Sequence, residues 1–352
     1  MQLFVGTFTN GFMGGTPAQG LYVFDIELAQ GAHQERHIAT RLHSPSYIAL
    51  HPTLPRLYSV ERQWTAEDKA QGALAVWDIA ADGQLKQLGR VPSGGAFSAH
   101  VSVAPDGRSV AVANPLGPNI AHFALTPDGR MARAPEIFTY TGRGPRARQN
   151  APWPHSCWFT PASMSMLVCD LGLDHVHHYQ RDAATQKLTP AALPFAQTHA
   201  GSGARHMAIH PLGRTIYVAN ELDGTISTLA FDSETGHLVT QQIIPAHSAL
   251  CQPAEIILSA DGAWLFVSLR GPEAIGVYAV DPQTQILRAH SFTPCLGQVP
   301  RHISLSPDGR FLLVCNQLSD AICVFAFDST QGQLQPTGQV ISVPSPSCAL
   351  LR

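Results

Sequence analysis

The sequence predicts an all-β chain folded as a seven-bladed β-propeller, and three observations support this fold class. A hairpin-like pattern, two short apolar runs around a tight turn, occurs six times along the 352 residues. Each unit continues with two more strand-like runs, so that it holds the four strands of a propeller blade. The two ends of the chain each lack what the other supplies, which predicts a seventh blade shared between them.

The clearest hairpin covers residues 204–222. Met207 to Ile209 and Ile216 to Ala219 are apolar, and the segment between them has the composition of a turn. The turn positions of the six hairpins are 53, 56, 50, 49 and 47 residues apart and are occupied by Pro52, Pro105, Pro161, Pro211, Ala260 and Pro307. A repeat of this length with several short strands is typical of a propeller.

The two ends of the chain are expected to complete one blade. Residues 3–8 have the pattern of a second strand with no first strand before it, whereas residues 346–351 resemble residues 45–50, which open a complete unit. We therefore expect the C-terminal strand to become the innermost strand of the N-terminal blade and to close the ring without exposed sheet edges. Residues 1–352 are then expected to form a single propeller domain.

Composition agrees with this architecture and excludes some functions. Hydrophobic residues make up 45% and charged residues 13% of the chain, with 29 Gly and 27 Pro, which suits many strands and turns. A net charge of −3 gives no support for a nucleic-acid or anionic-membrane partner. No apolar run approaches the about 20 residues that span a bilayer. The start shows no signal-peptide pattern, and seven cysteines without a C-x-x-C pair suit a reducing compartment, so a cytoplasmic location is expected.

Polar side chains recur at matching places in the repeated units. In a propeller the first strand of each blade lines the central channel, and in a hairpin its start lies beside the end of the second strand. Two adjacent positions at the start of the first strands hold Ser46, Ala99, His155, Arg205, Ala254 and Arg301, followed by Tyr47, His100, Ser156, His206, Glu255 and His302. The second strands end with Glu61, Asn114, Asp170, Glu221, Arg270 and Gln317. One mouth of the ring should therefore collect charged and polar groups, which predicts a site there.

Many of these polar residues also have a purely structural interpretation. Propeller channels are often polar, and His206 and His302 are expected to satisfy backbone groups or each other. Asp170 precedes Leu-Gly and is expected to cap a tight turn.

The arginines are harder to explain in this way. Arg205, Arg270 and Arg301 would repel one another unless an anion lies among them, and Glu221 neutralises only part of their charge. Arg148, in the basic stretch 143–148, can overhang the same rim and contact a phosphate or carboxylate. The sequence therefore predicts a small anionic ligand.

Metal and cofactor motifs are not evident in the sequence. His175 and His177 alternate on one face of an expected strand, but no carboxylate or cysteine partner is found at a useful spacing. The chain has no glycine-rich phosphate loop, no G-x-S-x-G and no H-E-x-x-H. Chemistry without a metal or a cofactor is the simpler expectation.

The sequence resembles the seven-bladed lactonase family, which includes a bacterial type of 6-phosphogluconolactonase and fungal carboxymuconate-lactonising enzyme. The resemblance runs over nearly the whole chain and is carried by the segments 5–9, 45–47, 57–61, 148–149, 154–156, 170–174, 203–206, 220–222, 268–271, 300–301 and 315–317. Three departures lie near the expected site: Trp153 replaces a usual His, Ala204 a usual Pro, and Leu269 a usual Asn. Pro115 likewise replaces a usual Tyr. These changes could indicate a different substrate.

The resemblance implies a catalytic group made of His155, Arg205, Glu221 and Arg270. The substrate is expected to contact further residues at the same mouth: Arg301, Arg148, His100, Glu61 and Gln317.

The expected activity is hydrolysis of an anionic sugar lactone, 6-phosphogluconolactone, to 6-phosphogluconate, as in the pentose phosphate pathway. His155 would act as the general base with help from Glu221, or Glu221 would itself be the base. The arginines would hold the carbonyl oxygen and the anionic group. Two alternatives remain open: a carboxymuconate cycloisomerase that uses the same residues, and a non-catalytic propeller that binds a ligand or partner protein through its channel.

Overall fold

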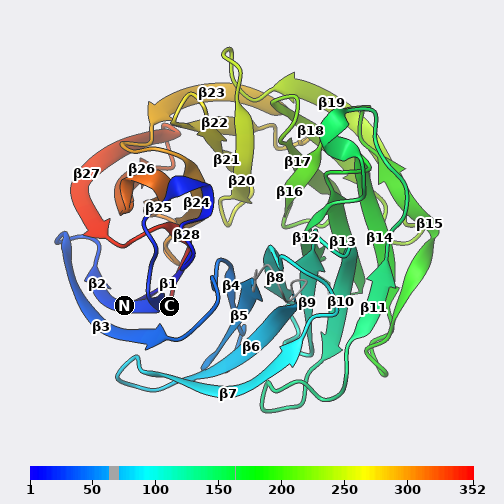
Figure 1. The fold of residues 1–352 in the computed structure, drawn as a ribbon. Helices are drawn as coiled ribbons and strands as arrows, with labels where there is room; N and C mark the ends of the chain where they lie inside the picture. Colours follow the sequence, from blue (N-terminus) through cyan, green and yellow to red (C-terminus); the bar gives the residue numbers. More distant parts are fainter. Residues whose placement is uncertain (63–70, 163) are drawn as a thin grey trace.

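The strands surround a central axis as seven antiparallel sheets of four strands each, counted over the described part of the chain (Figure 1). This computed structural model describes residues 1–62, 71–162 and 164–352. The seven-bladed propeller with four-stranded blades that the sequence predicts is therefore confirmed.

The blades are numbered from the one that holds the N-terminus, and their strands are given from the axis outward. Blade 1 contains β28 (Pro346–Leu351), β1 (Gln2–Thr7), β2 (Gly20–Glu27) and β3 (Ala32–Thr40), and blade 2 contains β4 (Ile48–Leu50), β5 (Arg56–Arg62), β6 (Gly72–Ile79) and β7 (Leu85–Pro92). Blade 3 contains β8 (His100–Val103), β9 (Ser109–Asn114), β10 (Asn119–Ala124) and β11 (Glu136–Thr139), and blade 4 contains β12 (Pro154–Phe159), β13 (Ser165–Asp170), β14 (His175–Arg181) and β15 (Leu188–Gln197). Blade 5 contains β16 (Ala204–Ile209), β17 (Thr215–Asn220), β18 (Thr225–Phe231) and β19 (Leu238–Pro245), and blade 6 contains β20 (Gln252–Leu258), β21 (Trp264–Arg270), β22 (Ala274–Val280) and β23 (Leu287–Pro294). Blade 7 contains β24 (Pro300–Leu305), β25 (Phe311–Asn316), β26 (Ala321–Asp328) and β27 (Gln333–Ser342), and short 3-10 helices lie at η1 (Phe12–Gly14), η2 (Ala147–Gln149) and η3 (Gln317–Ser319).

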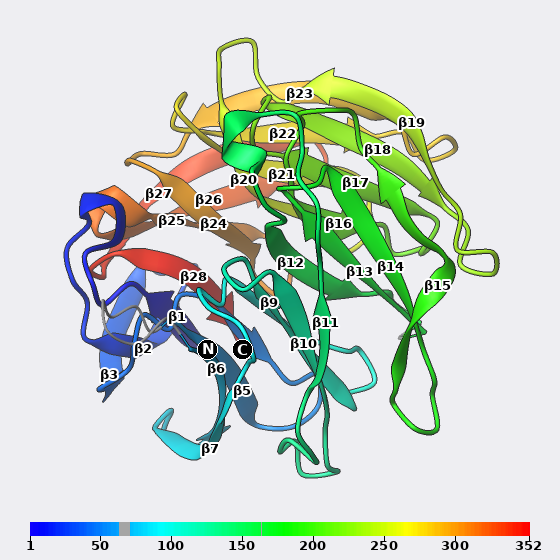
Figure 2. The ribbon, with the colours of Figure 1, turned by 45° about the vertical axis from the view of Figure 1, so that its right-hand side comes forward.

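The two ends of the chain meet in blade 1. Strand β28 pairs with β1 in antiparallel register, with Leu351 opposite Leu3 and Ala349 opposite Val5. The N- and C-termini consequently lie next to each other (Figures 1 and 2). The predicted closure of the ring by the C-terminal strand is confirmed, and it removes the edge that a blade of three strands would expose toward the axis.

The hydrophobic core lies between the blades. Every residue of β17 is buried, because both faces of an inner strand pack against neighbouring blades, whereas the outer strand β19 is largely exposed. Each pair of adjacent blades shares one apolar cluster; Leu3 and Leu313 join blades 1 and 7, and Phe4 and Leu57 join blades 1 and 2. Since apolar side chains fill the space between blades, the axis is left to polar side chains.

The described structure bears on two expectations, membrane spans and the state of the cysteines. Within the described ranges, no helix is long and apolar enough to cross a membrane. All seven cysteines are buried and free.

Candidate active site

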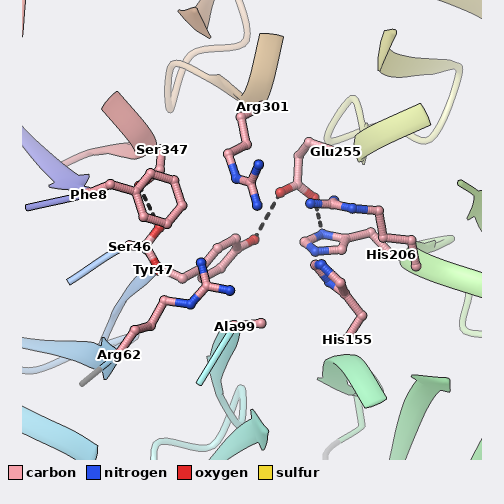
Figure 3. A pocket seen from close by; sticks show the side chains of 11 residues that line it. Phe8, Ser46, Tyr47, Arg62, Ala99, His155, His206, Glu255, Arg301 and Ser347 are labelled. Carbon is pink, nitrogen blue, oxygen red and sulfur yellow. Dashed lines mark hydrogen bonds and ion pairs between the residues drawn. The ribbon is translucent and has the colours of Figure 1, made fainter. Parts of the chain in front are cut away.

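A small cavity lies where the axis reaches one mouth of the ring (Figure 3). His155, Arg205 and Arg301 from three inner strands contribute to its walls, together with His206 and Glu255. The enclosed space is about 10 Å³, enough for about one water molecule. The structure thus brings together, at one mouth, side chains that are far apart in the sequence; His155 and Arg301, for example, are 146 residues apart.

β-bulges aim the three wall residues into the channel. On β16, Arg205 is an extra residue between two positions that pair with β17. His155 on β12 and Arg301 on β24 occupy bulges of the same kind. A bulge locally bends a strand and redirects one side chain, which is a common device beside functional sites.

Glu221, which directly follows β17, gathers three arginines around one buried carboxylate. Its Oε2 lies 2.8 Å from Arg205 Nε and 2.9 Å from Arg270 Nη2, and its Oε1 lies 2.8 Å from Arg148 Nη1. Burial alone would raise the pKa of Glu221, but Arg270, Arg205 and Arg148 outweigh this effect and hold the pKa far below its ordinary value. Glu221 is therefore ionised at neutral pH and is a poor proton acceptor.

Backbone and amide groups fix the arginines in place. Arg205 Nη1 donates a 2.5 Å hydrogen bond to the Ala254 carbonyl, and Arg270 Nε donates to the Gln252 carbonyl at 3.2 Å. Arg301 Nη1 donates to Gln317 Oε1 at 3.2 Å. These bonds occupy only part of each guanidinium, which has five N–H donors.

His155 is held in its neutral form. Its side chain is buried, and its Nδ1 has no hydrogen-bond partner within the described residues. Burial, followed by the charges of Arg205 and other neighbouring cationic groups, lowers the pKa of His155 well below 6.5. An uncharged imidazole beside fixed arginines is suited to accept a proton while the arginines stabilise negative charge.

Largely buried polar side chains, three of which also line the cavity, form a hydrogen-bonded group around Glu255. Glu255 accepts a 3.1 Å hydrogen bond from the Tyr47 hydroxyl at Oε2, and His206 Nδ1 lies 2.8 Å from its Oε1. His302 Nδ1 accepts a hydrogen bond from the Ala349 amide at 3.4 Å. His302 therefore satisfies a backbone amide, as expected, whereas His206, within the described residues, contacts the carboxylate of Glu255 and not a backbone group or His302.

The structure places Glu61 outside the channel, which corrects its prediction as a substrate contact. Neighbouring side chains of a strand point to opposite faces. Arg62 lines the cavity, whereas Glu61 faces away and pairs with Arg90 of β7, at 3.1 Å between Oε2 and Nε. Arg62 was not predicted as a channel residue for the same reason.

A register shift explains this error. Val60 lies opposite Tyr47, and the equivalent pair in blade 5 is Ala219 opposite His206. Arg62 follows Val60 by two residues, as Glu221 follows Ala219, so Arg62 and not Glu61 is equivalent to Glu221. Aligning the hairpins from their inner strands, rather than from the apparent ends of their second strands, would have found Arg62.

Two further expected residues have structural surroundings. His100 is fully buried, with its ring centroid 4.4 Å from that of Tyr47 and 4.5 Å from that of Trp158, and it is not among the side chains that line the cavity. Its prediction as a substrate contact is therefore not supported. Asp170 accepts hydrogen bonds from the backbone amides of Trp153, Gly172 and Leu173, which confirms it as a turn cap.

The histidine pair on β14 also differs from expectation. His177 Nε2 lies 3.4 Å from Asp170 Oδ2, so a carboxylate partner does exist, contrary to the sequence analysis. The partner was missed because Asp170 lies on the neighbouring strand β13. No group of three or more His, Cys, Asp or Glu side chains arranged to hold a metal is found among the described residues.

Comparison with known proteins gives a consistent picture. Residues 2–351 match the family described as "Lactonase, 7-bladed beta-propeller". A protein of Formosa agariphila named 6-phosphogluconolactonase is 29% identical over 347 residues, which cover 97% of this chain and 96% of that protein. A Bacillus subtilis protein of the same name is 28% identical over 353 residues, covering 98% and 96%. Among solved structures, the periplasmic gluconolactonase of Pseudomonas aeruginosa superposes with a TM-score of 0.90 at 29% identity and covers 99% of this chain and 98% of its own.

The family match spans nearly the full length, and the fold found independently in the structure is the fold that the family description names. This chain belongs to the lactonase family of seven-bladed β-propellers.

Proposed function

We propose that this protein hydrolyses an anionic sugar lactone, with 6-phosphogluconolactone as its candidate substrate, at the mouth lined by His155 and Arg205. The observation that carries the proposal is the cluster of three arginines on Glu221 beside a neutral, buried histidine. The names of the Formosa agariphila and Bacillus subtilis relatives support the same substrate.

The proposed reaction begins with water attack on the ester carbonyl. His155 takes a proton from the water, the oxygen of the water forms a bond to the carbonyl carbon, and the carbonyl oxygen becomes an oxyanion. Arg205 and Arg270 stabilise this oxyanion with N–H groups that their structural bonds leave free. When the intermediate collapses, the bond to the ring oxygen breaks, and this oxygen takes the proton from His155. The product is the open-chain acid.

His155 is the base in this proposal, and Glu221 organises the arginines. Three arginine contacts occupy the two oxygens of Glu221, and its lowered pKa makes it a weak acceptor. His155 has a bare Nδ1 and no carboxylate contact within the part of the chain that the structure describes. An uncharged imidazole with a free nitrogen can take up a proton, whereas the paired carboxylate of Glu221 cannot do so without losing its arginine contacts.

Enzyme-dependent hydrolysis of 6-phosphogluconolactone in a pH-stat tests the proposal. We expect turnover above the spontaneous rate and, for His155→Asn, a kcat lower by about 100- to 10,000-fold. His237→Asn, in an exposed turn after β18, is the matched control and should retain the wild-type rate.

The alternatives predict other results. Turnover of carboxymuconate but not of the lactone, followed spectrophotometrically, would favour a cycloisomerase. Turnover of neither substrate would favour a non-catalytic propeller.

The acidic limb of the kcat/KM profile is expected below pH 6.5. Burial, together with the nearby Arg205, holds the pKa of His155 well below 6.5, so protonation removes the base only at lower pH. Activity should therefore be flat from pH 6.5 to neutrality after subtraction of the spontaneous rate. A half-maximal point at or above pH 6.5 would show that a different group is the base.

A cytoplasmic location is also proposed. Seven buried, free cysteines suit a reducing compartment. The Pseudomonas aeruginosa relative is described as periplasmic, so fractionation of cells that express the native protein is the deciding measurement.

A further inference from the structure

Two arginines at the mouth have no carboxylate partner within the described residues. Arg62 is buried, and its Nε makes no hydrogen bond. Arg301 donates to the neutral amide of Gln317 at 3.2 Å and contacts Met13 Sδ at 3.7 Å. The carboxylate of Glu221, in contrast, forms ion pairs with the arginines on the other side of the mouth. Arg62 and Arg301 therefore differ from that group in having no carboxylate partner in the part of the chain that the structure describes.

Aromatic rings hold these two guanidinium groups. Arg62 lies 3.4 Å from the ring centroid of Phe97 and 5.3 Å from that of Phe12. Arg301 lies 5.0 Å from the ring centroid of Phe8 and 5.3 Å from that of Phe12. Cation–π contacts orient the arginines and exclude water, but they supply no neutralising charge. Burial, followed by the charge of Arg205, lowers the pKa of Arg62 to about 9, which shows how unfavourable this placement is without an anion.

The charge that the described residues give to the mouth is strongly positive. Among them, five arginines lie there, at positions 62, 148, 205, 270 and 301, against two carboxylates, Glu221 and Glu255. With all of these groups ionised their net charge is +3. A phosphate dianion is the group that most directly neutralises such an excess, and paired guanidinium groups match its oxygens.

We propose that Arg62 and Arg301 form the phosphate subsite of this protein and make it selective for phosphorylated lactones. This inference rests on the proposed function. Figure 3 shows both guanidinium groups pointing inward, with His155 across the cavity from Arg62. A substrate could therefore place its phosphate between these arginines and its ester at the opposite wall.

The segment that carries Phe12 and Met13 must move for this to happen. The enclosed space of about 10 Å³ is far too small for a phosphate. Met13 is 53% exposed and has a positive φ of 57°, and the flanking Gly11 and Gly14 also have positive φ. This short segment is exposed at Met13 and Gly14 and is held by a 3.0 Å hydrogen bond from Gln317 Nε2 to the Phe12 carbonyl, so it can shift at lower cost than the packed blades. Binding of a phosphorylated ligand is thus expected to displace residues 11–14.

Calorimetric titration with 6-phosphogluconate, gluconate and inorganic phosphate tests the subsite without requiring catalysis. For Arg62→Met and Arg301→Gln we expect at least a tenfold loss of affinity for 6-phosphogluconate and an unchanged affinity for gluconate. Arg90→Gln, which alters a neighbouring arginine outside the channel, is the matched control and should bind like wild type. The melting temperature of Arg62→Met should stay the same or rise, because the change removes a buried charge that has no carboxylate partner among residues 1–62, 71–162 and 164–352.

The outcomes separate the subsite from the proposed function. The subsite would be overturned if the variants lost affinity equally for 6-phosphogluconate and gluconate, or lost none. It would also be overturned if only inorganic phosphate bound, as an adventitious ion only. Selective loss together with no lactone hydrolysis would retain the subsite and reject the lactonase proposal. Hydrolysis of phosphorylated and unphosphorylated lactones at a ratio unchanged by Arg62→Met would retain the lactonase and reject the subsite. Arg62→Lys, which keeps the charge but not the planar fork, should be intermediate.

Discussion

Replacing Arg205 with glutamine is expected to lower kcat for 6-phosphogluconolactone by about 100- to 1,000-fold, the range seen when one oxyanion donor is lost. Arg205 is the extra residue of a bulge, and its side chain is only 3% exposed. Its contacts to Glu221 and to the Ala254 carbonyl fix the guanidinium and leave other N–H groups for the substrate. Glutamine can replace neither the charge nor this geometry, so the transition state should lose its main electrostatic support.

Steady-state kinetics with saturating substrate measure this effect. Arg36→Gln is the matched control, because Arg36 pairs with Asp25 on the exposed outer part of blade 1 and such surface pairs contribute little. The control should keep the wild-type kcat. A loss of less than tenfold for Arg205→Gln would mean that Arg205 serves the structure and not the reaction.

Glu221→Gln is expected to destabilise the fold by about 3–5 kcal/mol, the range for removing one partner of a buried ion pair. The substitution leaves Arg205 and Arg270, both nearly buried, without the carboxylate that lies 2.8 and 2.9 Å from them. Arg148 is 55% exposed at its side chain and can turn to solvent, so it should add little to the loss. Denaturant unfolding measures the change in the free energy of unfolding.

A double variant tests whether repulsion among the arginines causes this loss. Glu221→Gln combined with Arg270→Gln removes one of the stranded charges and should recover part of the stability. Two losses that simply add would contradict the shared-carboxylate arrangement. So would a single Glu221→Gln variant as stable as wild type.

The fold was predictable because it repeats. The same hairpin pattern occurs six times, so each copy supports the assignment of the others. The resemblance between residues 45–50 and 346–351 predicted the closing strand. Local apolar periodicity and turn residues carry this information, so errors at one unit are corrected by the others.

The site was only partly predictable because its details depend on strand register. Choosing Glu61 in place of Arg62 shifted one strand by one residue, and such a shift turns a side chain to the opposite face. The bulge at Arg205 could not be predicted from the sequence either, because the extra residue of a bulge is of no particular residue type. A strand pattern predicts which blade a residue belongs to more readily than the direction in which its side chain points.

Long-range partners were the least predictable feature. Arg148 was expected near the rim from its position before blade 4, but its contact with Glu221, 73 residues later, follows from the path of the η2 segment. Phe12, whose ring lies near the guanidinium groups of Arg62 and Arg301, is in a segment with no strand pattern. Sequence spacing does not encode such loop positions, because no repeating register constrains them.

A crystal structure with bound 6-phosphogluconate would show directly whether the axial mouth is the active site. We predict that the carboxylate of this product lies within hydrogen-bond distance of Arg205 and beside His155, at the axial mouth. Product bound instead in the surface groove lined by Arg143, His175 and Gln197 would contradict it, because that groove contains none of the proposed catalytic residues.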